Sequence, residues 1–125
     1  MALILMVEEE SLQRHGANKA LANEGYRLIS ITDPAATWAY ISRFKPDLVL
    51  LNGLSEGFES YDLLNDIKQR APELPVLVYM VKTHDDIKKL KQAVALALFE
   101  VRFSRREKQP RPGGARRADR VQTGL

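Results

Sequence analysis

The segment Asp47-Leu48-Val49-Leu50-Leu51-Asn52 decides the fold of this chain. Its four aliphatic residues follow Pro46-Asp47, and the segment runs into Asn52-Gly53, which is a strong turn signal. A short apolar run between turn signals is typical of a strand buried on both faces, as in a parallel sheet with helices on either side. The functional site of such a sheet lies at the carboxyl ends of its strands. The strand is therefore predicted to carry Asn52 to that site.

Apolar runs of the same kind recur along the chain and alternate with helical patterns. The first helix is predicted to stop at Gly25, because glycine commonly follows the last residue of a helix. The second is predicted to begin with Asp33 as its cap and Pro34 at its first position. Strands are expected at 2–7, 26–31, 47–52, 76–81 and 97–103, with helices between them. Strands alternating with helices predict a doubly wound α/β sheet.

Composition limits the class of protein. The 125 residues suffice for one domain, and 45% hydrophobic residues suffice for a core. The absence of cysteine excludes disulfides, thiolate catalysis and zinc–thiolate sites. The apolar start at 2–7 is too short to span a membrane and runs directly into three glutamates. We therefore expect a cytoplasmic protein that does not enter a membrane.

Charge is divided unevenly along the chain. Residues 105–125 contain seven Lys or Arg and two Asp or Glu, a net charge of +5. Residues 1–104 contain twelve basic and fourteen acidic residues, a net charge of −2. Residues 105–125 are also rich in proline and glycine and poor in apolar residues. We therefore expect a domain at 1–104 and a disordered basic tail at 105–125.

No catalytic motif is apparent in the sequence. No Gly-x-Gly-x-x-Gly follows the first strand, and no Ser, His and Asp set is recognisable. The two histidines, His15 and His84, have no ligand partners at metal-binding spacing. The chain is therefore predicted not to be an enzyme.

Several stretches resemble the response-regulator receiver domain, the phospho-accepting module of two-component signalling and phosphorelays. Residues 4–10 resemble its first strand and acidic pair, 45–51 its third strand, and 72–76 the approach to its fourth strand. The resemblance covers residues 2 to about 104. It implies a five-stranded parallel sheet of flavodoxin-like order 2-1-3-4-5. The fifth helix is expected to be missing or atypical, because the basic tail stands in its place.

The resemblance places Asn52 where the family has its phosphoacceptor aspartate. That chemistry needs a carboxylate oxygen as nucleophile, and an amide is a very poor substitute. Glu8 and Glu9 fall on the acidic pair that holds Mg²⁺ in the family. They are weak Mg²⁺ candidates, because each is one methylene longer than aspartate and the third carboxylate is replaced by Asn52. No other cofactor is expected.

Other positions of the family's site also differ. Met80 falls on the hydroxyl residue that ends the fourth strand, and we expect its side chain to fill the phosphate pocket. Arg102 falls on the lysine after the fifth strand and is expected to pair with the acidic pair across the same pocket. Phe103 falls on the proline that follows this lysine, and Phe99 falls on the switch aromatic without its hydroxyl.

These differences predict a phosphorylation-independent receiver-like domain, a pseudo-receiver, that acts as a protein-interaction module in signal transduction. One alternative is an active receiver with a displaced acceptor, such as Glu56, Glu59 or Glu8. Another is a regulator that contacts nucleic acid through the tail at 105–125, for which a linker is the simpler interpretation.

Two surfaces are candidates for a protein partner. The fourth helix carries Lys88, Lys89 and Lys91, which form either a docking face, as the resemblance implies, or a solvated face. The missing fifth helix would leave one face of the sheet and an edge of the first helix bare. Because exposed apolar surface of that kind tends to mark protein contacts, a homodimer through it is one expected arrangement.

Overall fold

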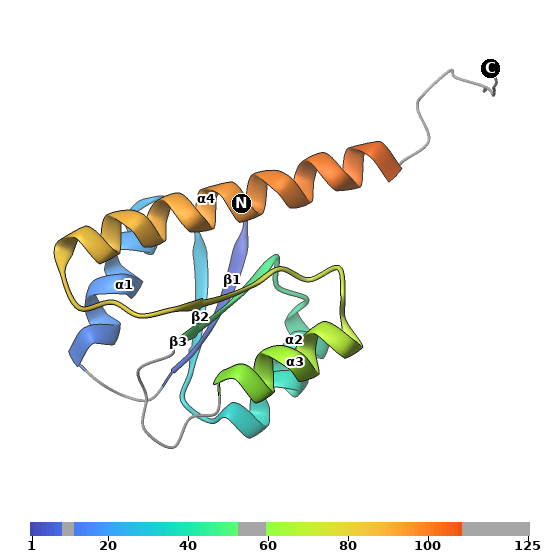
Figure 1. Ribbon diagram of the computed structural model, residues 1–125, viewed down its shortest axis with the longest axis horizontal. Coiled ribbons are helices and arrows are strands. Elements are labelled where there is room, and N and C mark those ends of the chain that lie inside the picture. The colour runs from blue at the N-terminus through green and yellow to red at the C-terminus, as the bar shows by residue number, and fades with distance from the viewer. Residues whose placement is uncertain (9–11, 53–59, 109–125) are drawn as a thin grey trace.

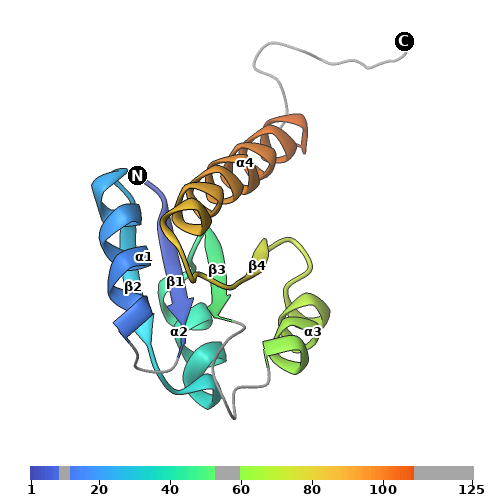
Figure 2. The ribbon, with the colours of Figure 1, turned by 60° about the vertical axis from the view of Figure 1, so that its left-hand side comes forward.

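The computed structural model describes residues 1–8, 12–52 and 60–108, with the backbone alone for 12–15, 52, 60–61 and 101–108. Within these ranges four strands form one parallel sheet, in the order β2-β1-β3-β4 (Figure 2). The strands are β1 (Leu3–Val7), β2 (Arg27–Ile31), β3 (Leu48–Asn52) and β4 (Val76–Tyr79). The predicted doubly wound α/β fold is confirmed, and the four strands lie where the apolar runs place them.

Helices connect the strands as the alternating pattern predicts (Figure 1). They are α1 (Leu12–Asn23), a 3₁₀ turn at Pro34–Ala36 that leads into α2 (Thr37–Phe44), α3 (Ser60–Arg70) and α4 (His84–Lys108). Gly25 follows α1 with φ of 92°, a left-handed conformation that glycine adopts without strain. The Asp33 carboxylate accepts a hydrogen bond from the Ala35 N–H at 3.0 Å, so it caps the turn as predicted.

The sheet separates two apolar layers, because successive residues of a strand point to opposite faces. Ile4 and Met6 of β1 pack against α1 and α4 on one face, whereas Leu5 and Val7 pack against α2 and α3 on the other. In Figure 1, α1 and α4 lie on one side of the strands and α2 and α3 on the other. The residues of the α1 and α4 layer that come from helices are Ala17, Leu21, Leu90, Val94 and Leu98.

The predicted fifth strand at 97–103 is wrong, because these residues continue helix α4. Leu90, Val94 and Leu98 recur every four residues and are all buried, which is the period of one helix face. The sequence from Val76 to Gln109 also contains no glycine or proline that would end the helix and start a strand. Tertiary packing of the helical stripe therefore prevails over the β-forming residues of this segment.

Helix α4 covers the sheet face that was expected to be bare. It lies beside α1, and Lys91 Nζ approaches Glu24 Oε2 of the α1–β2 turn at 3.9 Å. The two helices come close at Gly16, where an added Cβ would lie 3.3 Å from Ile87 Cδ1. The glycine inside α1, unfavourable for an isolated helix, is therefore explained by this close approach. The face through which a homodimer was expected is therefore not bare, since α4 occupies it.

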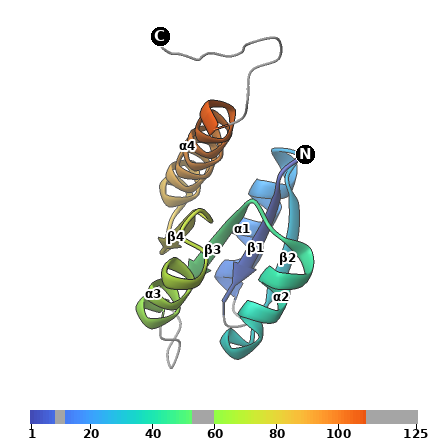
Figure 3. The ribbon, with the colours of Figure 1, turned by 90° about the vertical axis from the view of Figure 1, so that its right-hand side faces the viewer.

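Helix α4 is also longer than the sheet that it covers. Its 25 residues extend about 38 Å, whereas a five-residue strand extends about 17 Å. Its last part projects past the amino ends of the strands (Figures 1 and 3). The helix passes the predicted domain boundary at 104 and ends at Lys108; the rest of the predicted tail, 109–125, lies outside the described residues.

Candidate functional site

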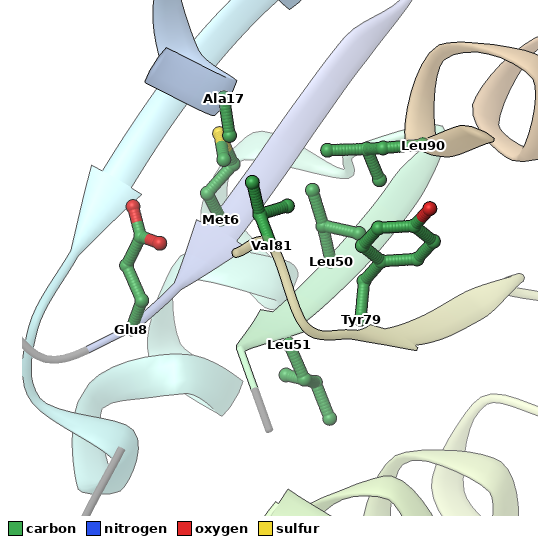
Figure 4. Close-up of a pocket in the computed structure, with 8 residues that line it drawn as sticks. All are labelled: Met6, Glu8, Ala17, Leu50, Leu51, Tyr79, Val81 and Leu90. Atoms are coloured by element: carbon green, nitrogen blue, oxygen red, sulfur yellow. The ribbon is translucent and has the colours of Figure 1, made fainter. Parts of the chain in front are cut away.

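A small pocket lies at the carboxyl ends of the central strands, where the sequence predicts the site. Its cavity volume is about 20 Å³, which is room for about one water molecule. Figure 4 shows the pocket from the α1 and α4 side of the sheet, with Glu8 and Tyr79 at its margins. The lining residues come from the strands, from α1 and from α4: Met6, Glu8, Ala17, Leu50, Leu51, Tyr79, Val81 and Leu90.

Glu8 is the acidic residue of this pocket. It directly follows β1, and its backbone N–H donates to the Ile31 carbonyl at 3.0 Å, which holds the end of the strand against β2. Its side chain is 5% exposed, and the pocket around it is lined mostly by apolar residues such as Met6 and Leu50. The structure thus places one of the predicted acidic residues in the site, while Glu9 lies outside the described residues.

The described pocket does not fit a magnesium ion. Among the residues that the structure describes, Glu8 is the single carboxylate of the lining, and no group of three or more His, Cys, Asp or Glu is placed to hold a metal. Magnesium needs near-ideal octahedral oxygen coordination, which thioether and aliphatic neighbours do not supply. No step of the function proposed below therefore depends on Mg²⁺.

Strand β3 ends at Asn52, whose Cα is opposite that of Tyr79 at the end of β4. Asn52 and the pocket therefore lie at the same end of the sheet, as the sequence predicts. Met80 follows Tyr79, but its side chain is 52% exposed. The expectation that Met80 fills the pocket is wrong, because the chain turns out of the sheet after Tyr79, and Tyr79 and Val81 line the pocket instead.

Residue 102 and Phe99, which the family resemblance assigns to the fifth strand, lie on α4 and away from the pocket. Residue 102 lies on α4, twelve residues beyond the pocket residue Leu90, a separation of about 18 Å along the helix axis. Helix α4 runs from the carboxyl ends of the strands toward their amino ends (Figure 2), so its later residues, 102 among them, lie toward the opposite end of the sheet from Glu8. The expected pairing of Arg102 with Glu8 is therefore wrong. Phe99 lies on the same helix and is 65% exposed, so it is not at a strand end.

Tyr79 is a site residue that the sequence analysis missed. Its hydroxyl donates to the Asp86 carbonyl at 2.7 Å, which ties the end of β4 to the first turn of α4. Burial raises the pKa of the Tyr79 phenol, and the negative charge of Asp86 raises it further. The sequence does carry a signal for it that the sequence analysis did not use: Tyr79 is an aromatic residue near the end of an apolar run, and a helix cap follows a few residues later.

The start of α4 is fixed by a reciprocal cap. The Asp86 carboxylate accepts from the N–H groups of Lys82 at 2.8 Å and Thr83 at 3.0 Å, while the Asp86 N–H donates to Thr83 Oγ1 at 3.2 Å. This is a capping box with aspartate as the acid, in which Thr83 is the N-cap of α4. The pKa of Asp86 is lowered, chiefly by the Lys82 N–H, because these donors stabilise the ionised form.

The predicted partner face on α4 is only in part exposed. Lys88 and Lys89 are exposed, but Lys91 is half-buried and lies against Glu24. Farther along the helix, Leu96 and Phe99 are 59% and 65% exposed and lie one turn apart. The outer side of α4 therefore presents basic residues first and large apolar residues after them.

In the described ranges, no helix has the length and apolar character needed to cross a membrane.

The fold and the site together define an open α/β domain with its pocket at the carboxyl ends of a parallel sheet. The family model of the response regulator receiver domain matches residues 4–101. The chain belongs to this family, whose members are signalling modules of two-component systems.

Similar proteins place the match in context. The chain is 34% identical over 77 residues to the DNA-binding transcriptional regulator NtrC of Rhizobium meliloti, an alignment covering 62% of this chain and 16% of that protein. The chain thus spans about a sixth of this relative. The structure of NtrX from Brucella abortus in complex with ADP has a TM-score of 0.75 and 24% identity, covering 91% of this chain and 31% of that one.

A second solved structure covers a receiver domain alone. The signal receiver domain of a Luxo repressor protein from Vibrio parahaemolyticus has a TM-score of 0.72 and 18% identity to this chain. The alignment covers 87% of this chain and 98% of that one. At these identities the solved structures establish the fold of the chain and nothing more.

Proposed function

We propose that this chain is a receiver domain that does not accept phosphate and acts as a protein-interaction module in signalling. The proposal rests on Asn52 at the end of β3, where the family resemblance places the acceptor aspartate. An amide nitrogen and oxygen cannot replace a carboxylate as nucleophile toward a phosphodonor. A signal would then have to enter or leave this domain by contact with other proteins.

The surroundings of Asn52 support the same conclusion. The described pocket holds one carboxylate and room for about one water, and its other walls are mostly apolar. Among the described residues no cationic side chain lines it, because the helix that carries residue 102 runs away from it. A transferred phosphoryl group needs cations or hydrogen-bond donors directed at its oxygens, and these are not provided by the described lining.

The outer side of α4 is the surface that this function would use. Lys88 and Lys89 offer positive charge, and Leu96 and Phe99 offer exposed apolar area on the same helix. Charged groups steer association, whereas large apolar and aromatic residues supply most of the binding energy at protein interfaces. A partner with an acidic and apolar surface fits this combination.

Labelling with a small acyl phosphate and Mg²⁺ tests the proposal. The intact protein is incubated with the phosphodonor beside a phospho-accepting receiver domain as positive control, and both are analysed by intact-mass spectrometry. We expect the control to gain one phosphoryl group and this chain to gain none. An acid-labile phosphoryl group on this chain, at Glu8, Glu56, Glu59 or any other carboxylate, would show that it is an active receiver with a displaced acceptor.

A further inference from the structure

Strand β4 is an edge of the sheet with an apolar sequence. In the described part of the chain no strand pairs with its outer side. Its residues Val76-Leu77-Val78-Tyr79 are apolar throughout, as in strands covered on both faces. Yet all four are only partly buried, whereas β1 is buried at every position. The strand contains no charged residue and no proline, the usual devices that protect an edge from pairing.

The register identifies which backbone groups face outward. The Val49 N–H of β3 donates to the Pro75 carbonyl at 3.0 Å, so residue 75 directs its backbone groups toward β3. Because the backbone groups of successive strand residues face opposite edges, Val76 and Val78 direct their N–H and C=O groups away from the sheet. These are the groups that an added strand would bond.

This edge is complementary to itself. If a second copy of β4 runs antiparallel with Leu77 opposite Leu77, then Val76 of each copy is opposite Val78 of the other. The outward N–H and C=O groups of Val76 in each copy then form hydrogen bonds with those of Val78 in the other. On the sheet face toward α2 and α3, Val76 of each copy lies beside Val78 of the other, and β-branched residues are favourable cross-strand neighbours. On the other side the two Leu77 side chains meet.

Charge at the two ends of the strand favours the antiparallel arrangement. Glu73 precedes the strand and Lys82 follows it, and both are exposed. Glu73 lies three residues before β4 and Lys82 three residues after it, so antiparallel pairing brings the Glu73 end of each strand toward the Lys82 end of the other, which is attractive. A parallel arrangement would place like charges together. The edge therefore carries a charge pattern that suits a second copy in one orientation.

The other edge of the sheet is a less suitable partner. Strand β2 exposes Arg27 and Ser30 along the edge that β4 would have to meet. Pairing of β4 with β2 of another copy would also be a head-to-tail contact, which extends into open filaments unless its rotation closes a ring. Pairing of β4 with β4 closes as a two-fold dimer.

We propose that this chain forms a weak two-fold dimer in which the β4 strands of two copies pair antiparallel into one continuous sheet. The contact is short, so it belongs with small and transient interfaces and depends on protein concentration. The dimer does not involve Asn52 and does not depend on phosphate. The inference goes beyond the proposed function, and its test contains no phosphodonor, so either one can fail without the other.

Amide hydrogen exchange across a concentration series tests the pairing residue by residue. We expect protection of the Val76 and Val78 amides to rise with concentration in step with the dimer fraction measured by analytical ultracentrifugation. The Leu77 and Tyr79 amides face β3 and should be protected at every concentration. A chain that stays monomeric to millimolar concentration, or a dimer without added protection at Val76 and Val78, would overturn the proposal.

Two sets of variants locate the contact. Val78→Pro removes an outward N–H without removing a bond to β3, and should weaken dimerisation about tenfold or more. Phe99→Ala on α4 is the control and should leave the dimerisation constant unchanged. Glu73→Lys and Lys82→Glu, which change exposed residues, should each weaken the dimer, and the double variant should restore it. Failure of this restoration, or loss of the dimer in Phe99→Ala, would contradict pairing through β4.

Discussion

Asn52 differs from aspartate by one group, an NH₂ in place of an oxygen, yet that group decides the chemistry available at the end of β3. The carboxylate of an aspartate would carry the nucleophilic electron pair, whereas the amide is neutral and a poor nucleophile. Two other positions that the family resemblance assigns to the site do not line the pocket. Met80 is half exposed, and the helix that carries residue 102 leads away from the pocket.

Restoring the carboxylate alone should therefore not restore phosphate acceptance. In Asn52→Asp, the acceptor oxygen is present, but no cation of the described lining stabilises the transferred group. Loss of one preorganised electrostatic donor typically slows a reaction about 100-fold or more. We expect labelling of this variant by a small acyl phosphate to be slower than that of a phospho-accepting receiver by at least this factor. Labelling at the rate of the control receiver would show that the pocket is intact apart from its nucleophile.

At the scale of elements, the start of α4 depends on a carboxylate that titrates. The folded-state pKa of Asp86 is lowered from its ordinary value of 3.8, because the Lys82 and Thr83 N–H groups donate to the ionised form. A group with a lowered folded-state pKa contributes stability above its unfolded-state pKa and loses it as pH falls through the folded-state value. The cap therefore contributes at neutral pH and is lost in acid.

Thermal melts from pH 7 to pH 2 check this dependence. Asp86→Asn should have a lower melting temperature than the unmodified chain at pH 7, and the difference should shrink as pH falls below about 4. Thr83→Ala is the control, since its hydroxyl does not titrate; it should cost about 0.5–2 kcal/mol with much less pH dependence. A constant difference for Asp86→Asn over the whole range would show that its charge does not support the cap.

At the scale of the molecule, α4 decides how the sheet is covered. It lies beside α1, over the face that would be bare if the chain continued as a fifth strand after residue 96. Because residues 97–103 are helical, β4 is also an edge strand in the described part of the chain. The sheet face beside α1 is covered and the β4 edge is open for the same reason: residues 97–103 continue a helix where a strand was predicted.

A pair of alanine substitutions separates helix from strand in this segment. Leu96 and Leu98 would share a face in a strand, but in α4 they lie on opposite sides, with exposed fractions of 59% and 6%. We expect Leu98→Ala to lower the free energy of unfolding by about 2–5 kcal/mol and Leu96→Ala to change it by less than about 0.5 kcal/mol. Denaturant melts at low protein concentration measure both. Similar losses from the two variants would indicate a strand.

The sequence by itself determined the four parallel strands, their helical connections and the position of Asn52. These features follow from local patterns: apolar runs between turn residues at Pro46 and Gly53, a stop at Gly25, and a cap at Asp33. Each pattern favours one local structure, so no knowledge of distant contacts was needed to predict it.

The tertiary structure decided the form of residues 97–103, and with it the cover of the sheet and the surroundings of the pocket. Val101 and Phe103 are typical of a strand, while Leu90, Val94 and Leu98 form a helical stripe, so the local pattern supported both structures. The stripe buries its side chains against α1 and β1. That burial favours the helix, and only residues distant in the sequence supply the surface on which it depends.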